Sequence, residues 1–311
     1  MAPRVRYRDR LALPAHLRRV RRGGAPAPRP ARGRLTPLPG SAAVPTLRVA
    51  TWNINSLRLR LGLVRELVSV LQPDVICLQE TKVPDALFPA EAPGALGYPY
   101  AAFRGMKGYN GVAILSRRPM EVLTDAPDWC AKGDCRHLAV RVDAARGAVE
   151  LHNFYVPAGG DVPDPARNPK FAHKLDFVAE ARAWFAARPR LERVVLAGDL
   201  NIAPLERDVW SHRQLLDVVS HTPVETEALL AWQATGFVDA VRHFVPAEER
   251  LFTWWSYRNR DWRRSDRGRR LDHVWASADL AGGLRGHTVL RDARDWARGS
   301  DHVPVAVDLA V

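Results

Sequence analysis

Cysteine is scarce in this sequence, and long apolar stretches are absent. Only three of the 311 residues are cysteines (Cys77, Cys130 and Cys135), which excludes a full disulfide framework. Cys77 lies in the apolar run Val75–Leu78 and is predicted to be a buried thiol, and we expect a reducing, cytoplasmic setting. Because no run of eighteen or more apolar residues occurs, we expect no membrane-spanning helix.

Two small clusters contain residue types that can bind metal ions. Cys130, Cys135 and His137 lie close together, but their spacing matches no common zinc motif and no second pair follows. His212 and His221 could form a metal or substrate site, or they could be hydrogen-bonded structural residues. We favour the structural interpretation for both clusters and keep the metal site as the alternative.

Acidic residues are nearly absent from the first 46 positions, which hold eleven arginines and one acid, Asp9, for a net charge of +10. The whole chain carries 46 basic and 34 acidic side chains, so 35 and 33 remain in residues 47–311, a net of +2. The bulk charge of this larger part is therefore nearly neutral. Any affinity for nucleic acid there must come from a local basic face.

Residues 1–46 are rich in Arg, Pro and Ala and show little periodicity. Such a segment buries too little apolar surface to offset its loss of conformational entropy, so we predict a disordered basic tail. Three interpretations are open for it: contact with DNA, a translated upstream segment without a role, or targeting. Residues 47–311 contain no linker and no internal repeat, which predicts a single domain.

From Leu47 onward, strand and helix patterns alternate. Apolar spacing predicts helices at 63–71, 170–187 and 225–235. Short apolar runs predict strands at Leu47–Trp52, Val75–Gln79, Gly111–Leu115, Leu138–Val142, Val149–Val156, Val194–Ala197, Leu271–Ala276 and Val303–Leu309. Many strands with a few long helices predict one α/β domain in which two sheets pack face to face and helices lie outside.

Six of the strand boundaries carry acids, amides, a tyrosine or a histidine. The clusters are Asn53-Ile54-Asn55, Glu80-Thr81-Lys82, Tyr155, Asp199-Leu200-Asn201, Leu271-Asp272-His273 and Ser300-Asp301-His302. A single acid after a strand is usually a solvated turn residue or a helix cap. Six such clusters, spread over about 250 residues, predict one shared pocket if the strand ends lie at one edge. So many like charges in one pocket would require a cation among them.

These residue types also limit the chemistry. Oxygen ligands without a set of Cys or several His favour Mg²⁺ or Mn²⁺ over zinc, and such a cation suits phosphoryl hydrolysis. Asp199, with help from Asn201, could orient and deprotonate a water molecule. His302 could balance the charge of the phosphate, and a hydrogen bond to Asp272 would keep its ring cationic.

The same segments resemble, in order, the motif series of the exonuclease III and abasic-site endonuclease family within the endonuclease/exonuclease/phosphatase superfamily. The matching segments run from about Leu47 to Val311 and comprise Trp52–Asn55, Leu78–Lys82, Tyr109–Ala113, Gly198–Asn201 and Ser300–His302. The DNA-repair branch is indicated by Tyr155–Pro157, Phe252–Arg258 and Gly268–Asp272. This resemblance implies a four-layer αββα sandwich of two mixed sheets with helices outside.

For the metal, the resemblance implies Mg²⁺, with Mn²⁺ as a possible substitute. It makes Glu80 the principal ligand and places Asn53 and Asp301 near the ion. Asn55 corresponds to a position that is Asp in animal relatives, which removes a charge and leaves its metal role open.

For the reaction, the resemblance implies a role for each of five residues. Asp199 would activate water or shuttle a proton, and Asn201 would donate a hydrogen bond in the transition state. His302 would contact the phosphate while Asp272 braces it, and Tyr155 would form a hydrogen bond near the scissile group.

Aromatic and basic side chains are interleaved between Trp254 and Arg270. Arginines can grip phosphates, while an aromatic ring can stack on a base or fill the space of a missing one. We predict DNA contacts from Trp254, Trp255, Arg258 and Arg269, with the two tryptophans as a pocket wall. The alternative is that one or both tryptophans are core residues before a solvated basic loop. Arg269 stands where animal relatives carry Trp beside the abasic pocket, so a different wall is implied.

A second predicted DNA contact comprises Arg104, Lys107 and Asn110, next to glycines that indicate a loop able to approach a backbone closely. A purely structural role for this patch is an equal alternative. Lys170 follows Asn168, which should cap the next helix, and we place Lys170 near phosphate.

The expected function is that of a monomeric, Mg²⁺-dependent nuclease of the exodeoxyribonuclease III type. It would cut the phosphodiester 5′ to abasic sites in double-stranded DNA and act at 3′ termini as a 3′→5′ exonuclease and 3′-phosphatase. One alternative keeps the fold but acts on phosphomonoesters or phospholipid headgroups, against which the Arg/aromatic run argues. The other is a DNA-binding module without catalysis, which the complete acid, amide and His set opposes.

Overall fold

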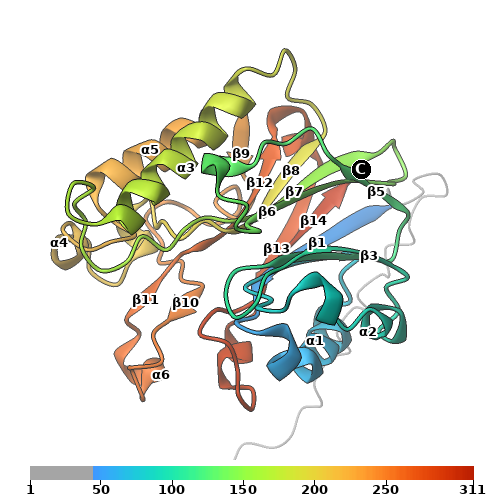
Figure 1. Ribbon diagram of the computed structural model, residues 1–311, viewed down its shortest axis with the longest axis horizontal. Helices are drawn as coiled ribbons and strands as arrows, with labels where there is room; N and C mark the ends of the chain where they lie inside the picture. The colour runs from blue at the N-terminus through green and yellow to red at the C-terminus, as the bar shows by residue number, and fades with distance from the viewer. Residues whose placement is uncertain (1–44) are drawn as a thin grey trace, which may run out of the picture. The chain divides into compact units, whose positions relative to one another are not determined.

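Two six-stranded mixed sheets form the framework of the computed structural model, which describes residues 45–311 (Figure 1). The predictions for the basic tail therefore lie outside the described residues, except for its last two positions. The first sheet has the order β13-β14-β1-β2-β4-β3, and the second has the order β5-β6-β7-β8-β12-β9. A third sheet has only two strands, β10 (Trp254–Trp255) and β11 (Gly268–Arg269), which pair antiparallel.

Eight of the twelve strands in the two large sheets coincide with the predicted apolar runs. Those of the first sheet are β1 (Thr46–Asn53), β2 (Val75–Gln79), β3 (Tyr100–Arg104), β4 (Val112–Ser116), β13 (Leu284–Val289) and β14 (Val305–Ala310). Those of the second sheet are β5 (Met120–Leu123), β6 (His137–Val142), β7 (Val149–Tyr155), β8 (Val194–Asp199), β9 (Phe237–Asp239) and β12 (Asp272–Ser277). All eight predicted strands are present.

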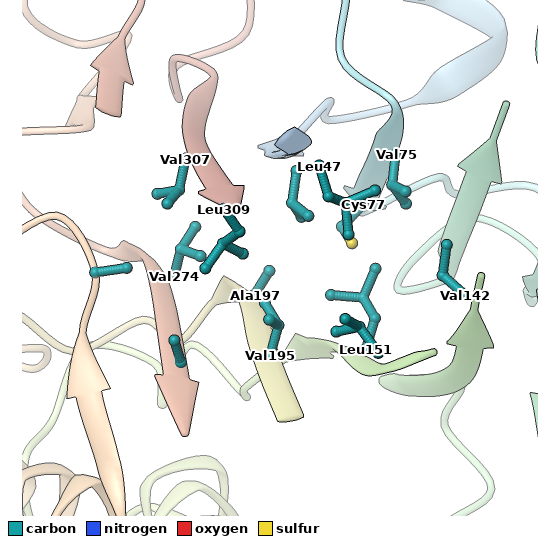
Figure 2. Packing of buried hydrophobic residues seen from close by; sticks show 14 of the residues in the cluster. Leu47, Val75, Cys77, Val142, Leu151, Val195, Ala197, Val274, Val307 and Leu309 are labelled. Atoms are coloured by element: carbon teal, nitrogen blue, oxygen red, sulfur yellow. The ribbon is translucent and has the colours of Figure 1, made fainter. Parts of the chain in front are cut away.

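The two sheets pack face to face through apolar side chains. Figure 2 shows side chains of the first sheet, such as Cys77 and Leu309, facing those of the second, such as Leu151 and Val195. Each of these residues is at most 1% exposed, so the prediction of a buried thiol at Cys77 is confirmed. Their removal from water is the main force that holds the sheets together.

Helices cover the outer faces. Helix α1 (Leu57–Leu71) packs on the first sheet through residues at helical spacing, and Gln72 closes it in the left-handed region before Pro73. Helices α3 (Pro169–Ala186) and α5 (Pro223–Gln233) cover the second sheet (Figure 1). The predicted four-layer αββα sandwich is thereby confirmed.

The remaining helices are short. They are α2 (Glu91–Ala95), α4 (His212–Leu215) and α6 (Trp262–Ser265), with single 3₁₀ turns at Asp85–Leu87, Trp129–Ala131, Glu206–Asp208, Ala278–Gly283 and Arg291–Asp295. Asn168 caps α3 as predicted, because its side chain accepts a hydrogen bond from the Lys170 amide. No helix within residues 45–311 combines the length and apolar character needed to cross a bilayer.

Strand direction determines where the polar strand ends gather. Each sheet contains one parallel pair, β1–β2 and β7–β8, and an antiparallel strand lies beside each pair, β14 beside β1 and β12 beside β8. The carboxyl ends of the parallel strands and the amino ends of their antiparallel neighbours therefore share one edge. Asn53, Tyr155, Asp199 and Asp272 all lie at this edge.

A buried histidine in β12 predicts how stability depends on pH. His273 is fully buried and its Nε2 donates to the Ile202 carbonyl (2.9 Å), while burial and the nearby Arg270 lower its pKa to about 3. Between that value and the ordinary 6.5, the unfolded chain binds a proton that the folded one does not. The free energy of unfolding should therefore rise with pH across this window, and His273 contributes up to ~1.4 kcal/mol per pH unit.

Urea unfolding of the wild type and His273→Gln at several pH values between 3.5 and 6.5 measures this slope, with exposed His243→Gln as the matched control. The slope should become shallower in His273→Gln alone. Equal slopes in all three proteins would contradict the assignment.

Candidate active site

Asn53 connects the two sheets at the polar edge. Its Nδ2 donates to Glu80 Oε1 (2.8 Å), which follows β2, and to Asp199 Oδ2 (2.9 Å), which ends β8 in the other sheet. The Tyr155 hydroxyl donates to the same Glu80 oxygen (2.9 Å). Two strand ends from each sheet are thus joined by one network of hydrogen bonds.

Lys82 lies on the other oxygen of Glu80. Its Nζ is 2.7 Å from Glu80 Oε2 and donates to Asn55 Oδ1 (2.6 Å), while Asn55 Nδ2 donates to Asp301 Oδ1 (3.2 Å). Burial alone would raise the pKa of Glu80, but hydrogen bonds from Asn53 and Lys82 outweigh burial and lower it. Lys82 was not among the predicted site residues, although it stands within the Glu80-Thr81-Lys82 cluster that indicated the site.

His302 lies between two aspartates. Its Nδ1 is 2.9 Å from Asp272 Oδ2 and its Nε2 is 3.7 Å from Asp199 Oδ2. Burial would lower the pKa of His302, but the charges of Asp272 and Asp199 outweigh it and raise the pKa to about 10. The ring is therefore an imidazolium at neutral pH. Thr253, which sequence reasoning missed, donates its hydroxyl to Asp272 Oδ2 (2.7 Å).

Asp199 is held by the turn that follows β8. The Asn201 amide donates to its Oδ1 (2.9 Å), and Asn201 Nδ2 donates to its Oδ2 (3.2 Å). Burial raises the pKa of Asp199 to about 7, against the opposing charge of His302. Gly198 is required just before it, because a Cβ there would lie 2.0 Å from the Phe154 carbonyl oxygen.

A buried lysine supports the same turn from α3. Lys174 is completely buried and its Nζ donates to the Asn201 carbonyl (2.8 Å) and to the buried carboxylate of Glu225. The Lys174–Glu225 pair thereby holds in place the turn that carries Asp199 and Asn201. No sequence signal indicated this role, since a lysine within a helix ordinarily reaches solvent.

Two places at this edge could hold a cation. Asp199, Asp272 and His302 offer ligand atoms within 4.8 Å of one another, the only such group of three in residues 45–311. A protonated imidazole, however, has no lone pair for a metal. At Glu80, Lys82 places an ammonium against a carboxylate and an amide oxygen. Carboxylate and amide oxygens that already bind a cationic group therefore lie together at Glu80, and this combination fits Mg²⁺.

The two tryptophans of the aromatic run differ in position. Trp254 is half-buried, and its Nε1 donates to Asp301 Oδ2 (3.0 Å) while the Arg269 guanidinium lies over its ring (5.4 Å). Trp255 is completely buried in a core with Phe252 and donates to Asp266. The predicted DNA contact of Trp255 is therefore corrected to a core role, the alternative raised for one of the pair.

The residues of the second predicted DNA patch also differ in exposure. Arg104 and Lys107 are exposed, as are Arg258 near the first patch and Lys170 at the start of α3. Asn110 is only 4% exposed and its Nδ2 donates to the Asp134 carbonyl (2.9 Å), so this amide stabilises a loop. The prediction that Asn110 contacts DNA is corrected accordingly.

The histidine and cysteine clusters have structural surroundings. His212 Nδ1 and His221 Nε2 are 2.8 Å apart, and His221 Nδ1 donates to the Ala203 carbonyl (2.6 Å). His137 is buried and its Nε2 lies 3.0 Å from His152 Nδ1. Within the described part of the chain, neither cluster gathers three metal-ligating side chains. The hydrogen bonds of these histidines favour the structural interpretation of both clusters.

Comparisons with known proteins agree with this fold. The model of the endonuclease/exonuclease/phosphatase family matches residues 50–302. Exodeoxyribonuclease III of Haemophilus influenzae is 29% identical and aligns over 83% of this chain and 98% of its own length. DNA repair nuclease APEX1 of Danio rerio is 30% identical, over 89% of this chain and 86% of its own.

Solved structures are similar over the same region. A 3′ phosphatase from Neisseria, NExo, bound to a product DNA hairpin has a TM-score of 0.77 and 31% identity, covering 85% of this chain and 99% of its own. An AP endonuclease from Archaeoglobus fulgidus has a TM-score of 0.77 and 30% identity, with 85% and 100% covered. The matched family model, the shared fold and the gathered strand-end residues lead to one conclusion: this chain belongs to the endonuclease/exonuclease/phosphatase family, among relatives of the exonuclease III type.

Proposed function

We propose that the protein is a Mg²⁺-dependent DNA-repair nuclease that hydrolyses the phosphodiester 5′ to abasic sites in double-stranded DNA. We include in the proposal removal of nucleotides and phosphates from 3′ termini. The observation that carries it is the arrangement of Asp199, His302 and Asp272 beside Glu80. Asp199 supplies a carboxylate and His302 an imidazolium, and Asp272 is hydrogen-bonded to the His302 ring. The DNA-repair relatives and the DNA-bound neighbour support the substrate class.

The residues divide the work of hydrolysis between them. The Asp199 carboxylate accepts a proton from the attacking water, which is efficient because its pKa of about 7 lies near physiological pH. The His302 imidazolium lies beside Asp199 Oδ2. It balances the negative charge that develops on the phosphate. Asn201 Nδ2 and the Tyr155 hydroxyl are additional donors at this edge.

Glu80 is the proposed principal metal ligand, with Asn53 and Asp301 nearby. When bound there, Mg²⁺ supplies positive charge for the phosphoryl oxygens and the leaving oxygen. Lys82 must move off the Glu80 oxygen or share it, because its Nζ is 2.7 Å away.

The decisive experiment is incision of a duplex that contains one tetrahydrofuran abasic analogue, with Mg²⁺ or with EDTA. We expect one incision 5′ to the analogue with Mg²⁺ and none with EDTA. Inositol phosphates and a sphingomyelin vesicle serve as competing substrates. Faster turnover of either would overturn the proposal in favour of the phosphomonoesterase or phospholipid alternative, and absence of any product would leave only a binding module.

Glu80→Gln should lower the apparent affinity for Mg²⁺ by about 10–100-fold, because the neutral amide loses the charge that Asn53 and Lys82 now stabilise. Isothermal titration of Mg²⁺ and a Mg²⁺ titration of incision rate measure this change. Glu66→Gln, an exposed change on α1, is the matched control. A Glu80→Gln protein that binds Mg²⁺ as tightly as the control would show that the ion lies elsewhere.

A further inference from the structure

A cavity of about 760 Å³ adjoins the proposed catalytic edge. Trp254 belongs to both: it lines the cavity, and its Nε1 donates to Asp301 Oδ2 (3.0 Å). The other walls come from the loop after β7, the segment around α4 and the segment between β10 and β11. A ligand in this cavity would therefore lie next to the group under attack.

The cavity carries positive charge that the protein does not neutralise. Arg258, Arg267 and Arg269 line it, and within residues 45–311 none of them forms an ion pair, whereas Arg263 and Arg270 of the same segment do. The one acid in the lining, Asp161, is exposed. Three guanidinium groups without carboxylate partners fit a phosphate-bearing ligand.

Arg269 is fixed in place. Its Nη1 donates to the Val219 carbonyl (2.9 Å) and to Ser220 Oγ (2.7 Å), and its guanidinium lies over the Trp254 ring. The Nε and Nη2 donors have no partner in the described part of the chain. The group is therefore held rigidly with donors to spare, which suits recognition better than a mobile surface arginine does.

Aromatic rings flank the same space. Arg267 lies over the Trp210 ring (4.7 Å), as Arg269 lies over Trp254 (5.4 Å). Indole and guanidinium planes are the surfaces on which nucleobases stack. An abasic sugar has no base to use them, and the cavity is of the size that drug-sized ligands occupy rather than one five-membered ring.

We propose that this cavity takes a base-bearing nucleotide adjoining the scissile phosphate, and that Arg269 is the residue that selects it over a bare abasic sugar. The inference rests on the proposed function and deepens it. Arg269 thereby sets the balance between removal of intact 3′ nucleotides and incision at abasic sites.

The test compares the full chain with Arg269→Leu and Arg269→Lys on two duplexes of equal sequence in Mg²⁺. One duplex ends in a 3′-terminal 2-aminopurine nucleotide, and the other contains one internal tetrahydrofuran. Arg263→Leu, which removes a nearby arginine outside the cavity lining, is the matched control. Rates of nucleotide release and of incision are measured, together with 2-aminopurine fluorescence on binding in EDTA, which reports stacking without turnover.

Arg269→Leu should lower nucleotide release relative to abasic incision by about tenfold or more and weaken the fluorescence quenching, with Arg269→Lys in between. A ratio unchanged from Arg263→Leu, or an equal fall of both activities, would overturn the role of Arg269 while leaving the nuclease intact. A wild type that acts on neither duplex would instead refute the proposed function itself.

Discussion

Asp199→Asn is expected to lower kcat for incision of the abasic duplex by about 10²–10⁴-fold, the usual contribution of a general base. The amide is isosteric with the carboxylate but cannot accept the proton of the attacking water. It also faces the Nδ2 donor of Asn53 and the His302 imidazolium, which favour a negatively charged oxygen. Affinity for DNA should stay within a fewfold of wild type, because Asp199 is only 1% exposed.

Single-turnover incision and fluorescence anisotropy with the same duplex separate these two effects. Asp143→Asn changes an exposed carboxylate on the loop after β6 and should match the wild type in both measurements. Undiminished incision by Asp199→Asn would rule out Asp199 as the base. A loss of affinity as large as the loss of rate would assign it a role in binding.

Asp272→Asn is expected to lower kcat by about 10²–10³-fold, the scale seen when a preorganised charge partner of the transition state is lost. The wild-type His302 ring is cationic below its pKa of about 10, so the wild-type rate should fall as pH rises through about 10. Without the Asp272 charge, burial lowers the pKa of His302, and the fall should begin at a lower pH. A pH–rate profile of the two proteins shows the displacement directly.

Thr253→Val provides the graded comparison. It removes one hydrogen bond to Asp272 Oδ2 but keeps the charge, so the loss of rate should be smaller and the alkaline limb should move little. If the profile of Asp272→Asn overlays that of the wild type apart from scale, His302 does not act through its charge.

The sequence predicted the interior of both sheets better than their margins. All eight predicted strands exist, but β3, β5, β9 and β13 were missed, and these four are the outer strands of the two sheets. An edge strand buries fewer apolar side chains, and β13, with Arg285, His287 and a bulge near Gly286, has little apolar pattern to detect.

Site residues at the ends of strands could be predicted from the sequence. Residues that hold the site in place from other elements could not. Asn53, Glu80 and Asp199 could be proposed because polar residues interrupt apolar runs. Lys174 could not, because its burial depends on how α3 lies against the turn at Asn201. The different positions of Trp254 and Trp255 likewise depend on the side of β10 that faces the core, which a two-residue strand does not reveal.

The pairing of β1 with β14 has a consequence for synthesis on the ribosome. Residues 46–51 pair with residues 305–310, and His302 lies just before that last strand. A growing chain therefore carries Asn53 and Glu80 for most of its synthesis without His302 and with one side of β1 unpaired. Contacts of such large sequence separation form late. The site is therefore complete only once the last strand has been made, and a chain that terminates before His302 lacks the imidazole of the site.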